Sequence, residues 1–210
     1  NASYAYTATL SSKWKLSGGA ALGTRSLQIS PEKFKFEDAI ISGNPTSESI
    51  ENLNSSTTLG IDLGIHLFSG KKTSISLGLQ NINFPSFEGL LEDLKTKPTI
   101  SFYASHKLKI SGSHYRPNTL EAHLTPSFVY LYQHPFSQMR IGSNAEIESV
   151  LIGLYYRGLF GSIEDQFQGD AIILQAGLRQ EKLQIIYSYD LSISGRESAG
   201  GTHELSINYF

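Results

Sequence analysis

Cysteine is absent from the sequence of 210 residues, so disulfide bridges and thiolate metal ligands are excluded. Charge is also scarce, because Asp, Glu, Lys and Arg make up 17% of the chain, against about 25% in ordinary soluble domains. The 17 basic and 19 acidic side chains nearly balance, which argues against a nucleic-acid partner, since nucleic acids need a concentrated basic face. No run of about 18 apolar residues occurs, so a membrane-spanning helix is excluded as well.

Residues typical of β-structure take the place of charge. Tyr and Phe each occur 11 times and Gly 19 times, whereas Met and Trp each occur once. Aromatic residues fit the pleated surface of a strand, and strong helix formers are few. The composition therefore favours an all-β protein.

Alternation of apolar and polar residues is the dominant pattern along the chain. It is clearest over residues 59–67, where every odd position is aliphatic and the even positions are small or polar. Because a strand directs alternate side chains to opposite faces, such a segment has one apolar and one polar face. The pattern predicts about eleven strands, near residues 2–11, 14–29, 57–68, 73–83, 98–111, 119–133, 138–147, 149–160, 169–180, 182–194 and 201–210. Residues 88–94 are the one segment where a single helical turn is an alternative.

The connectors between these strands alternate in length. Tight turns lie near residues 11–13, 69–71, 148 and 181, and longer connections lie near 30–56, 84–97, 161–168 and 195–200. The connectors at 112–118 and 134–137 break this alternation. The overall pattern predicts an antiparallel up-and-down meander whose two rims face different environments.

Two architectures are built from alternating strands. In a soluble sandwich the apolar face packs inward, whereas in an outer-membrane barrel it meets lipid and the polar face lines the lumen. The predicted strands are long enough for the about 9–11 residues that cross the hydrocarbon, and soluble strands average about 5–6. The polar face is rich in Gly and Ser, and aromatic residues gather near strand ends as they do at membrane interfaces. We therefore predict a single transmembrane β-barrel domain over residues 1–210.

This prediction assigns side chains to the two faces of the barrel wall. The residues expected to face lipid are Leu59, Ile61, Leu63, Ile65, Ile172, Leu174, Leu183, Ile185 and Tyr187. The polar residues expected in the lumen are Asp62, His66, Arg140, Glu146, Arg157, Arg179, Asp190 and Glu204. Either this polar set gates a pore or binds a secreted segment, or its members pair with one another and with water to fill the lumen.

The start of the chain predicts a barrel that is incomplete at its N-terminus. Asn1 opens directly into an alternating segment, without Met. If the long connectors are external, the first strand begins outside and the last strand ends on the periplasmic side. We therefore expect an odd number of strands before Asn1, because bacterial single-chain barrels have an even strand number.

Several segments of the C-terminal third are similar to one bacterial family. They are Ile152–Arg157, Gly169–Ile172, Ile186–Asp190 and Gly200–Ile207, and the Gly-Gly-Thr-His-Glu sequence at 200–204 is the most specific. With these segments the chain resembles the PorP/SprF family of the type IX secretion system in gliding Gram-negative bacteria. The resemblance implies a FadL-type barrel of about fourteen strands, of which about three precede this chain.

The resemblance also implies a component role and no enzymatic activity. It places the protein in the outer membrane of a Gram-negative bacterium, in contact with outer-membrane lipid. The implied partners are periplasmic lipoproteins and ring proteins of the secretion and gliding machinery, and the C-terminal domains of secreted adhesins that are delivered to or anchored on the cell surface. The second hypothesis is a transport channel for small solutes. The third hypothesis is that the chain is a soluble β-protein.

Neither a catalytic site nor a metal site is predicted. The six His residues, at positions 66, 106, 114, 123, 134 and 203, show no paired metal-ligand spacing. His203 and Glu204 are neighbours on one strand and point to opposite faces, so they cannot hold one ion. The sequence has no Gly-x-Ser-x-Gly elbow and no Gly-rich phosphate loop, so neither a serine hydrolase nor a cofactor is expected.

The two longest connectors are candidates for recognition. Residues 31–56 carry five acidic side chains and either contact a partner or form plain solvated surface. Residues 84–97 are more apolar, and they either fold into the lumen as a plug, which we favour, or face another subunit. The residues that would form this plug are Phe84, Phe87, Leu90 and Leu91.

Overall fold

The computed structural model describes residues 1–27, 56–87, 94–111, 121–160, 167–193 and 201–209, and these residues form strands and turns. The strands are β1 (Ala2–Thr9), β2 (Lys15–Leu27), β3 (Ser56–Ser69), β4 (Thr73–Gln80), β5 (Ser86–Phe87), β6 (Leu94–Lys95), β7 (Thr99–His106), β8 (Leu108–Ser111), β9 (Ala122–Gln133), β10 (Phe136–Ile147), β11 (Val150–Phe160), β12 (Phe167–Gln180), β13 (Leu183–Ser192) and β14 (Thr202–Tyr209). A helix able to span a bilayer is not found among the described residues.

The strands of the main sheet pair antiparallel in chain order, except that β7 pairs with β9 and not with β8. The order is β1-β2-β3-β4-β7-β9-β10-β11-β12-β13-β14, and β8 pairs with β9 beside this path. The predicted all-β, up-and-down meander is therefore confirmed. The strand expected at 98–111 is split into β7 and β8 at Lys107, whose backbone N–H donates to the Lys72 carbonyl at 2.6 Å.

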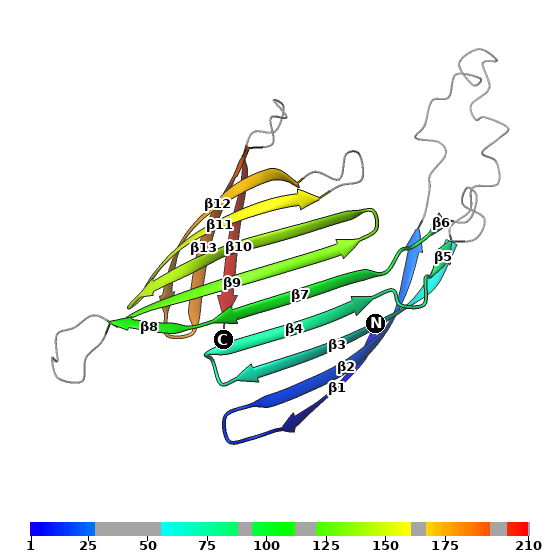
Figure 1. Cartoon of the computed structure of the whole chain (residues 1–210), viewed down its shortest axis with the longest axis horizontal. Helices are drawn as coiled ribbons and strands as arrows, with labels where there is room; N and C mark the ends of the chain where they lie inside the picture. Colours follow the sequence, from blue (N-terminus) through cyan, green and yellow to red (C-terminus); the bar gives the residue numbers. More distant parts are fainter. Residues whose placement is uncertain (28–55, 88–93, 112–120, 161–166, 194–200, 210) are drawn as a thin grey trace, which may run out of the picture.

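The connectors fall at two opposite ends of the sheet (Figure 1). The turn rim is the end with the hairpin turns β1–β2, β3–β4, β10–β11 and β12–β13. The loop rim is the end where β2 leads to β3, β4 to β7, β11 to β12 and β13 to β14. Within the described residues, β1 pairs only with β2 and β14 only with β13, so the sheet has the form of a barrel wall that is open between these two strands.

The sheet is curved, and its two faces differ in chemistry. On the convex face, aliphatic side chains stand exposed, as with Ile152 and Leu154 at 58% and Leu178 at 61%. Leaving such a side chain in water forgoes about 1.5–3 kcal/mol, and soluble monomers rarely expose apolar patches larger than a few hundred Å². The convex face is therefore suited to hydrocarbon. The opposite face is concave, because side chains meet there across an intervening strand, as described below.

The connector from β4 to β7 is anchored on β3. β4 pairs with β3 only as far as Leu63 opposite Leu79, so the first part of β3 lacks a strand on that side. The Asn83 carboxamide takes the place of strand backbone, since its Oδ1 accepts from the Ile61 N–H at 3.0 Å and its Nδ2 donates to the Leu59 carbonyl at 2.7 Å. Residues 88–93, where a helical turn was an alternative, lie outside the described residues, and Leu94 belongs to β6.

Candidate functional site on the concave face

Arg157 on β11 binds two carboxylates that come from the next two strands. Its Nε lies 2.5 Å from Asp170 Oδ2 on β12, and its Nη1 lies 2.7 Å from Asp190 Oδ2 on β13. The three side chains are between 21% and 28% exposed. The planar guanidinium can serve two acceptors at once, and without it the two carboxylates would repel each other. This loop-rim cluster therefore holds three strands together with a net charge of one negative unit.

A β-bulge brings Asp170 to the concave face. Arg157 lies opposite Ala171, whereas the next residue, Gly158, lies opposite Gly169, so Asp170 is the extra residue in β12. In regular alternation Asp170 would share the convex face with Ile172. A bulge re-aims the extra side chain, and here it turns a carboxylate away from the apolar face and toward Arg157.

A second group of ion pairs lies at the turn rim. Glu146 on β10 binds the Lys107 ammonium at 2.7 Å and the Arg179 guanidinium on β12 at 3.4 Å. The two cations come from opposite sides, each across an intervening strand. Lys109 and Glu121 form a more exposed pair at 3.1 Å on the same rim. Glu146 therefore ties together five neighbouring segments of the sheet, from the β7–β8 junction to β12.

Apolar side chains fill the concave face between these two charged groups. The side chains of Leu151, Tyr155, Ala171 and Ile173 are 2–7% exposed. The Arg140 guanidinium lies 5.3 Å from the centre of the Tyr155 ring. The expectation that aromatic residues near strand ends lie at membrane interfaces is wrong for Tyr155, because its side chain shares the concave phase of Arg157 and is buried. The concave face of β10–β13 thus combines an apolar core with paired charges.

The concave face of the N-terminal strands is instead lined by small side chains. We call this surface the small-residue wall, and its members are Ser17, Gly19, Ala21 and Gly23 on β2, Gly60 and Gly64 on β3, and Ser74, Ser76 and Gly78 on β4. Gly64 pairs with Gly19 on one side and with Gly78 on the other. Glycine inside a strand often marks a place where a ligand or another backbone approaches closely. Large side chains therefore fill the concave face of β10–β13, whereas small side chains leave the concave face of β2–β4 without projecting groups.

Asp62 and His66 on β3 are polar exceptions in the small-residue wall. Asp62 Oδ1 accepts from the Asn81 N–H at 2.9 Å and lies 3.9 Å from Arg25 Nη2. His66 Nε2 lies 2.8 Å from Ser74 Oγ, and its ring stacks on Phe68. Both residues bind neighbouring strands, and neither joins the Arg157 cluster.

The structure brings some of the residues expected in the lumen together and keeps others apart. All of them lie in the concave phase of their strands. Arg157 meets Asp190, and Glu146 meets Arg179, whereas Glu204 on β14 is exposed and accepts from the Ser206 hydroxyl at 3.2 Å. The predicted lumen set is thus divided between the loop rim, the turn rim and β3.

The residues expected to face lipid all lie in the convex phase. Ile61 and Ile172 are partly covered, and the exposed members are Leu59, Leu63, Ile65, Leu174, Leu183, Ile185 and Tyr187. Of the plug candidates, Phe87 is buried, Phe84 is exposed, and Leu90 and Leu91 lie outside the described residues. The connector at 31–56 also lies outside them, apart from Ser56.

Within the described residues, hydrogen bonds to neighbouring hydroxyl groups hold His66, His106 and His203. His106 Nδ1 lies 2.8 Å from Thr73 Oγ1, and His203 Nδ1 lies 2.6 Å from the Tyr187 hydroxyl. In the part of the chain that the structure describes, no three His, Asp or Glu side chains gather into a group that could hold a metal ion.

Comparison with known proteins decides the family. The family model described as type IX secretion system membrane protein PorP/SprF matches residues 1–209. The chain belongs to the PorP/SprF family. No match was found among curated proteins, and none among solved structures. The resemblance inferred from the C-terminal segments is confirmed, and the chain is a type IX secretion system membrane component with an all-β fold.

One member of the site in this PorP/SprF chain escapes the alternation rule. Asp170 is out of phase with the concave residues of β12, and the one signal for it is Gly169, since an isolated glycine within a strand suggests a bulge. Alternation places Tyr155 in the phase of Arg157, but its burial opposite Gly142 depends on the pairing of β10 with β11. The register of β11 with its neighbours therefore decides the surroundings of both residues.

Proposed function

We propose that this PorP/SprF protein is a non-enzymatic component of the type IX secretion and gliding machinery in the outer membrane. In this role it docks periplasmic partners and helps to secrete or anchor surface adhesins through their C-terminal domains. The exposed aliphatic convex face supports the membrane placement, because a barrel wall needs an apolar band toward lipid. The family supports the secretion role.

The small-residue wall is the observation that supports contact with a secreted polypeptide. Gly19, Gly64 and Gly78 form one row across three strands, with serine and alanine around them. An extended segment of a secreted protein can bring its backbone close to such a surface, and the serine hydroxyls can bind its amide groups. The filled half around Tyr155 offers no such room.

The turn rim supports docking on the periplasmic side. If the longer connectors are external, the turn rim faces the periplasm. Glu148 and Glu181 lie at the tips of the hairpins β10–β11 and β12–β13, where both are exposed. We propose these tips as the contact for periplasmic lipoproteins or ring proteins.

The experiment fills the small-residue wall without disturbing the sheet. A side chain at Gly64 has room, because the nearest atom to its Cβ position is the Leu77 carbonyl oxygen at 3.8 Å. Gly18 is the matched control on the convex face, since nothing lies within 4 Å of its Cβ position. We expect Gly64→Phe to lower surface display of an adhesin about tenfold and Gly18→Phe to leave it unchanged, with equal amounts of folded barrel for both.

Planar-bilayer conductance separates this function from a channel for small solutes. A docking and secretion component should give little ion conductance, with or without Gly64→Phe. If the unmodified protein conducts ions, if Gly64→Phe closes that conductance, and if adhesin display persists, the protein is a solute channel and the proposal is wrong.

A further inference from the structure

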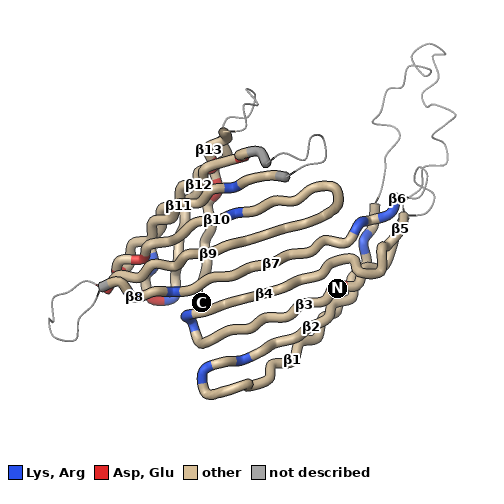
Figure 2. The backbone as a smooth tube through the Cα atoms, in the orientation of Figure 1, with Lys and Arg blue, Asp and Glu red and all other residues tan. Residues whose placement is uncertain are grey.

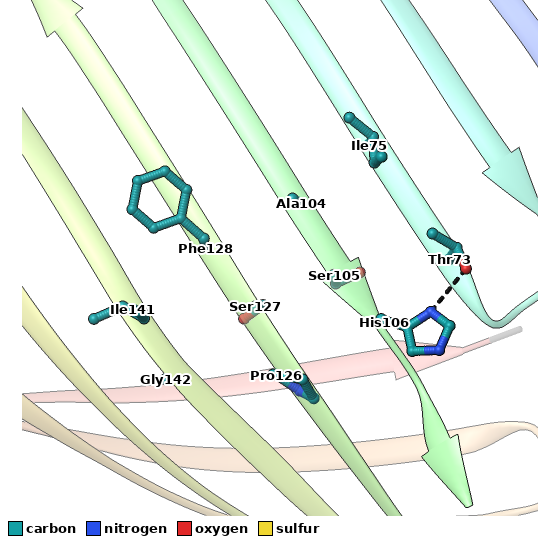
Figure 3. A pocket seen from close by; sticks show the side chains of 10 residues that line it. All are labelled: Thr73, Ile75, Ala104, Ser105, His106, Pro126, Ser127, Phe128, Ile141 and Gly142. Carbon is teal, nitrogen blue, oxygen red and sulfur yellow. Dashed lines mark hydrogen bonds between the residues drawn. The ribbon is translucent and has the colours of Figure 1, made fainter.

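A groove crosses four strands on the convex face. Ile75, Ala104, Phe128 and Ile141 form one row over β4, β7, β9 and β10, because each is paired with the next. Ala104 is the smallest side chain of the row, and Figure 3 shows Ile75, Phe128 and Ile141 on either side of it. The groove has a volume of about 370 Å³. Its size falls within the about 300–1,000 Å³ that is usual for small-molecule sites.

The end of the groove toward the turn rim is polar. Thr73 pairs with His106 in the next row, and the Thr73 hydroxyl lies 2.8 Å from His106 Nδ1 (Figure 3). This bond fixes the imidazole on the convex face. Among the described residues no hydrogen bond involves the other ring nitrogen, Nε2, so it can bind a polar group at the mouth of the groove.

Lysines stand beside this polar end. Lys71 and Lys72 are exposed in the β3–β4 turn, and the Lys72 carbonyl is bonded to the backbone N–H that follows His106. Lys13 and Lys15 lie at the adjacent β1–β2 turn, and Figure 2 shows this part of the turn rim as basic. Among the described residues, no ion pair involves Lys71 or Lys72, whereas the nearby Lys107 is paired with Glu146.

We propose that this groove binds an anionic glycerophospholipid. An acyl chain lies along Ala104, and the phosphate is held by Lys71, Lys72 and His106. Basic side chains at a membrane surface attract anionic headgroups, and the apolar groove is on the face that meets hydrocarbon. A soluble periplasmic protein would meet the two lysines but leave the groove empty. The choice of a phospholipid rests on the proposed outer-membrane placement, with the turn rim on the periplasmic side.

The test measures lipid retained by the purified full-length protein. The protein is delipidated in detergent, exposed to an equimolar mixture of phosphatidylglycerol and phosphatidylcholine, and analysed by native mass spectrometry. We expect preferential retention of phosphatidylglycerol. Lys71→Gln with Lys72→Gln should lower that retention about tenfold, and Ala104→Leu should lower the retention of both lipids by filling the groove.

Two matched controls stand elsewhere on the sheet. Lys95→Gln with Lys97→Gln removes two exposed lysines at the loop rim, and Ala176→Leu adds the same side chain to the exposed convex face of β12. Both controls should keep the retention of the unmodified protein. Equal retention of the two lipids, or normal retention by Ala104→Leu, would overturn the proposal.

A further outcome separates a lipid site from a protein-docking site. If the Lys71 and Lys72 substitutions weaken binding of a periplasmic secretion protein and leave phosphatidylglycerol retention unchanged, the lysines serve a protein and the lipid proposal is wrong. Lipid retention is measured on the isolated protein, and adhesin display is measured on cells. A negative result for the lipid therefore does not count against the proposed function, which the adhesin-display experiment tests separately.

Discussion

Tyr155 on β11 lies directly across from Gly142 on β10, and its ring occupies the space that a side chain at residue 142 would need. The Leu154 carbonyl oxygen closes the same space from the backbone side. A glycine at this position lets the aromatic ring lie flat over the neighbouring strand, as aromatic residues do over glycines in designed sheets. The burial of Tyr155 therefore depends on the absence of a side chain at position 142.

The first prediction follows from this pair. Gly142→Ala should destabilise the folded protein by about 1–3 kcal/mol, because the added Cβ forces the Tyr155 ring and the β11 backbone to move. Urea unfolding of the protein refolded into lipid vesicles measures the change as a lower midpoint. Gly18→Ala, on the open convex side, should shift the free energy of unfolding by no more than about 0.5 kcal/mol. Equal effects of the two substitutions would contradict the role of the ring.

The second prediction concerns the Arg157 cluster. Arg157→Gln should cost about 2 kcal/mol of stability, because it leaves two partly buried carboxylates side by side without their cation. Adding Asp170→Asn to Arg157→Gln should restore part of the loss, since one of the two charges is then gone. The same unfolding measurement on both variants checks this.

Arg25→Gln is the control for the cluster. Arg25 lies 3.9 Å from Asp62, and both side chains are more than a third exposed, so its loss should cost at most about 0.5 kcal/mol. If Arg25→Gln lowered stability as much as Arg157→Gln, then neither the burial of Arg157 nor its second carboxylate partner would contribute to the stability of the cluster.

The third prediction tests the hairpin tip at Glu181. Its φ angle is 46°, in the left-handed region where a Cβ is strained. Glu181→Val should therefore destabilise the protein by about 1–2 kcal/mol, whereas Glu181→Gly should be tolerated. Lys182→Val is the neighbouring control and should have little effect. If Val is accepted equally at both positions, the backbone at residue 181 is not strained.

The fourth prediction tests Asn83 as a substitute for strand backbone. Asn83→Leu removes the acceptor for the Ile61 N–H and the donor for the Leu59 carbonyl, so Ile61 should lose protection from amide hydrogen exchange. Asn83→Asp keeps the acceptor and should retain most of the protection at Ile61. Unchanged exchange at Ile61 in Asn83→Leu would show that another group takes over the bond.

The general architecture can be predicted from the sequence because it depends on alternation alone. The aliphatic positions of β3 and β12, such as Leu63 and Leu174, repeat every second residue, and the sheet exposes them on one face. Glu146 and Arg179 are placed in the correct phase by the same rule. Their contact is not predictable, since it depends on which strands are neighbours and on the curvature that brings β10 and β12 side chains together across β11.

Other parts of the site depend on local departures from regular pairing. Asn83 is an unremarkable connector residue in the sequence, and its role appears only because β4 ends before β3 does. The apolar residues Leu151 and Ile173 lie on the face that alternation assigns to polar groups, and they are buried there by the packing of β11 against β12. Register and curvature, which are properties of the assembled sheet, decide these details.

The single added residue in β12 has a consequence for how this segment tolerates changes in length. Removing Gly169 would let β12 pair evenly with β11, and the ladder would gain regularity. The position now held by Asp170 would then stand opposite Gly158, with its carboxylate on the apolar convex face. Deleting one residue there would remove a minor irregularity of the backbone but would place a charge on the apolar face. The number of residues between Phe167 and Ala171 is therefore constrained more tightly than the identity of their side chains.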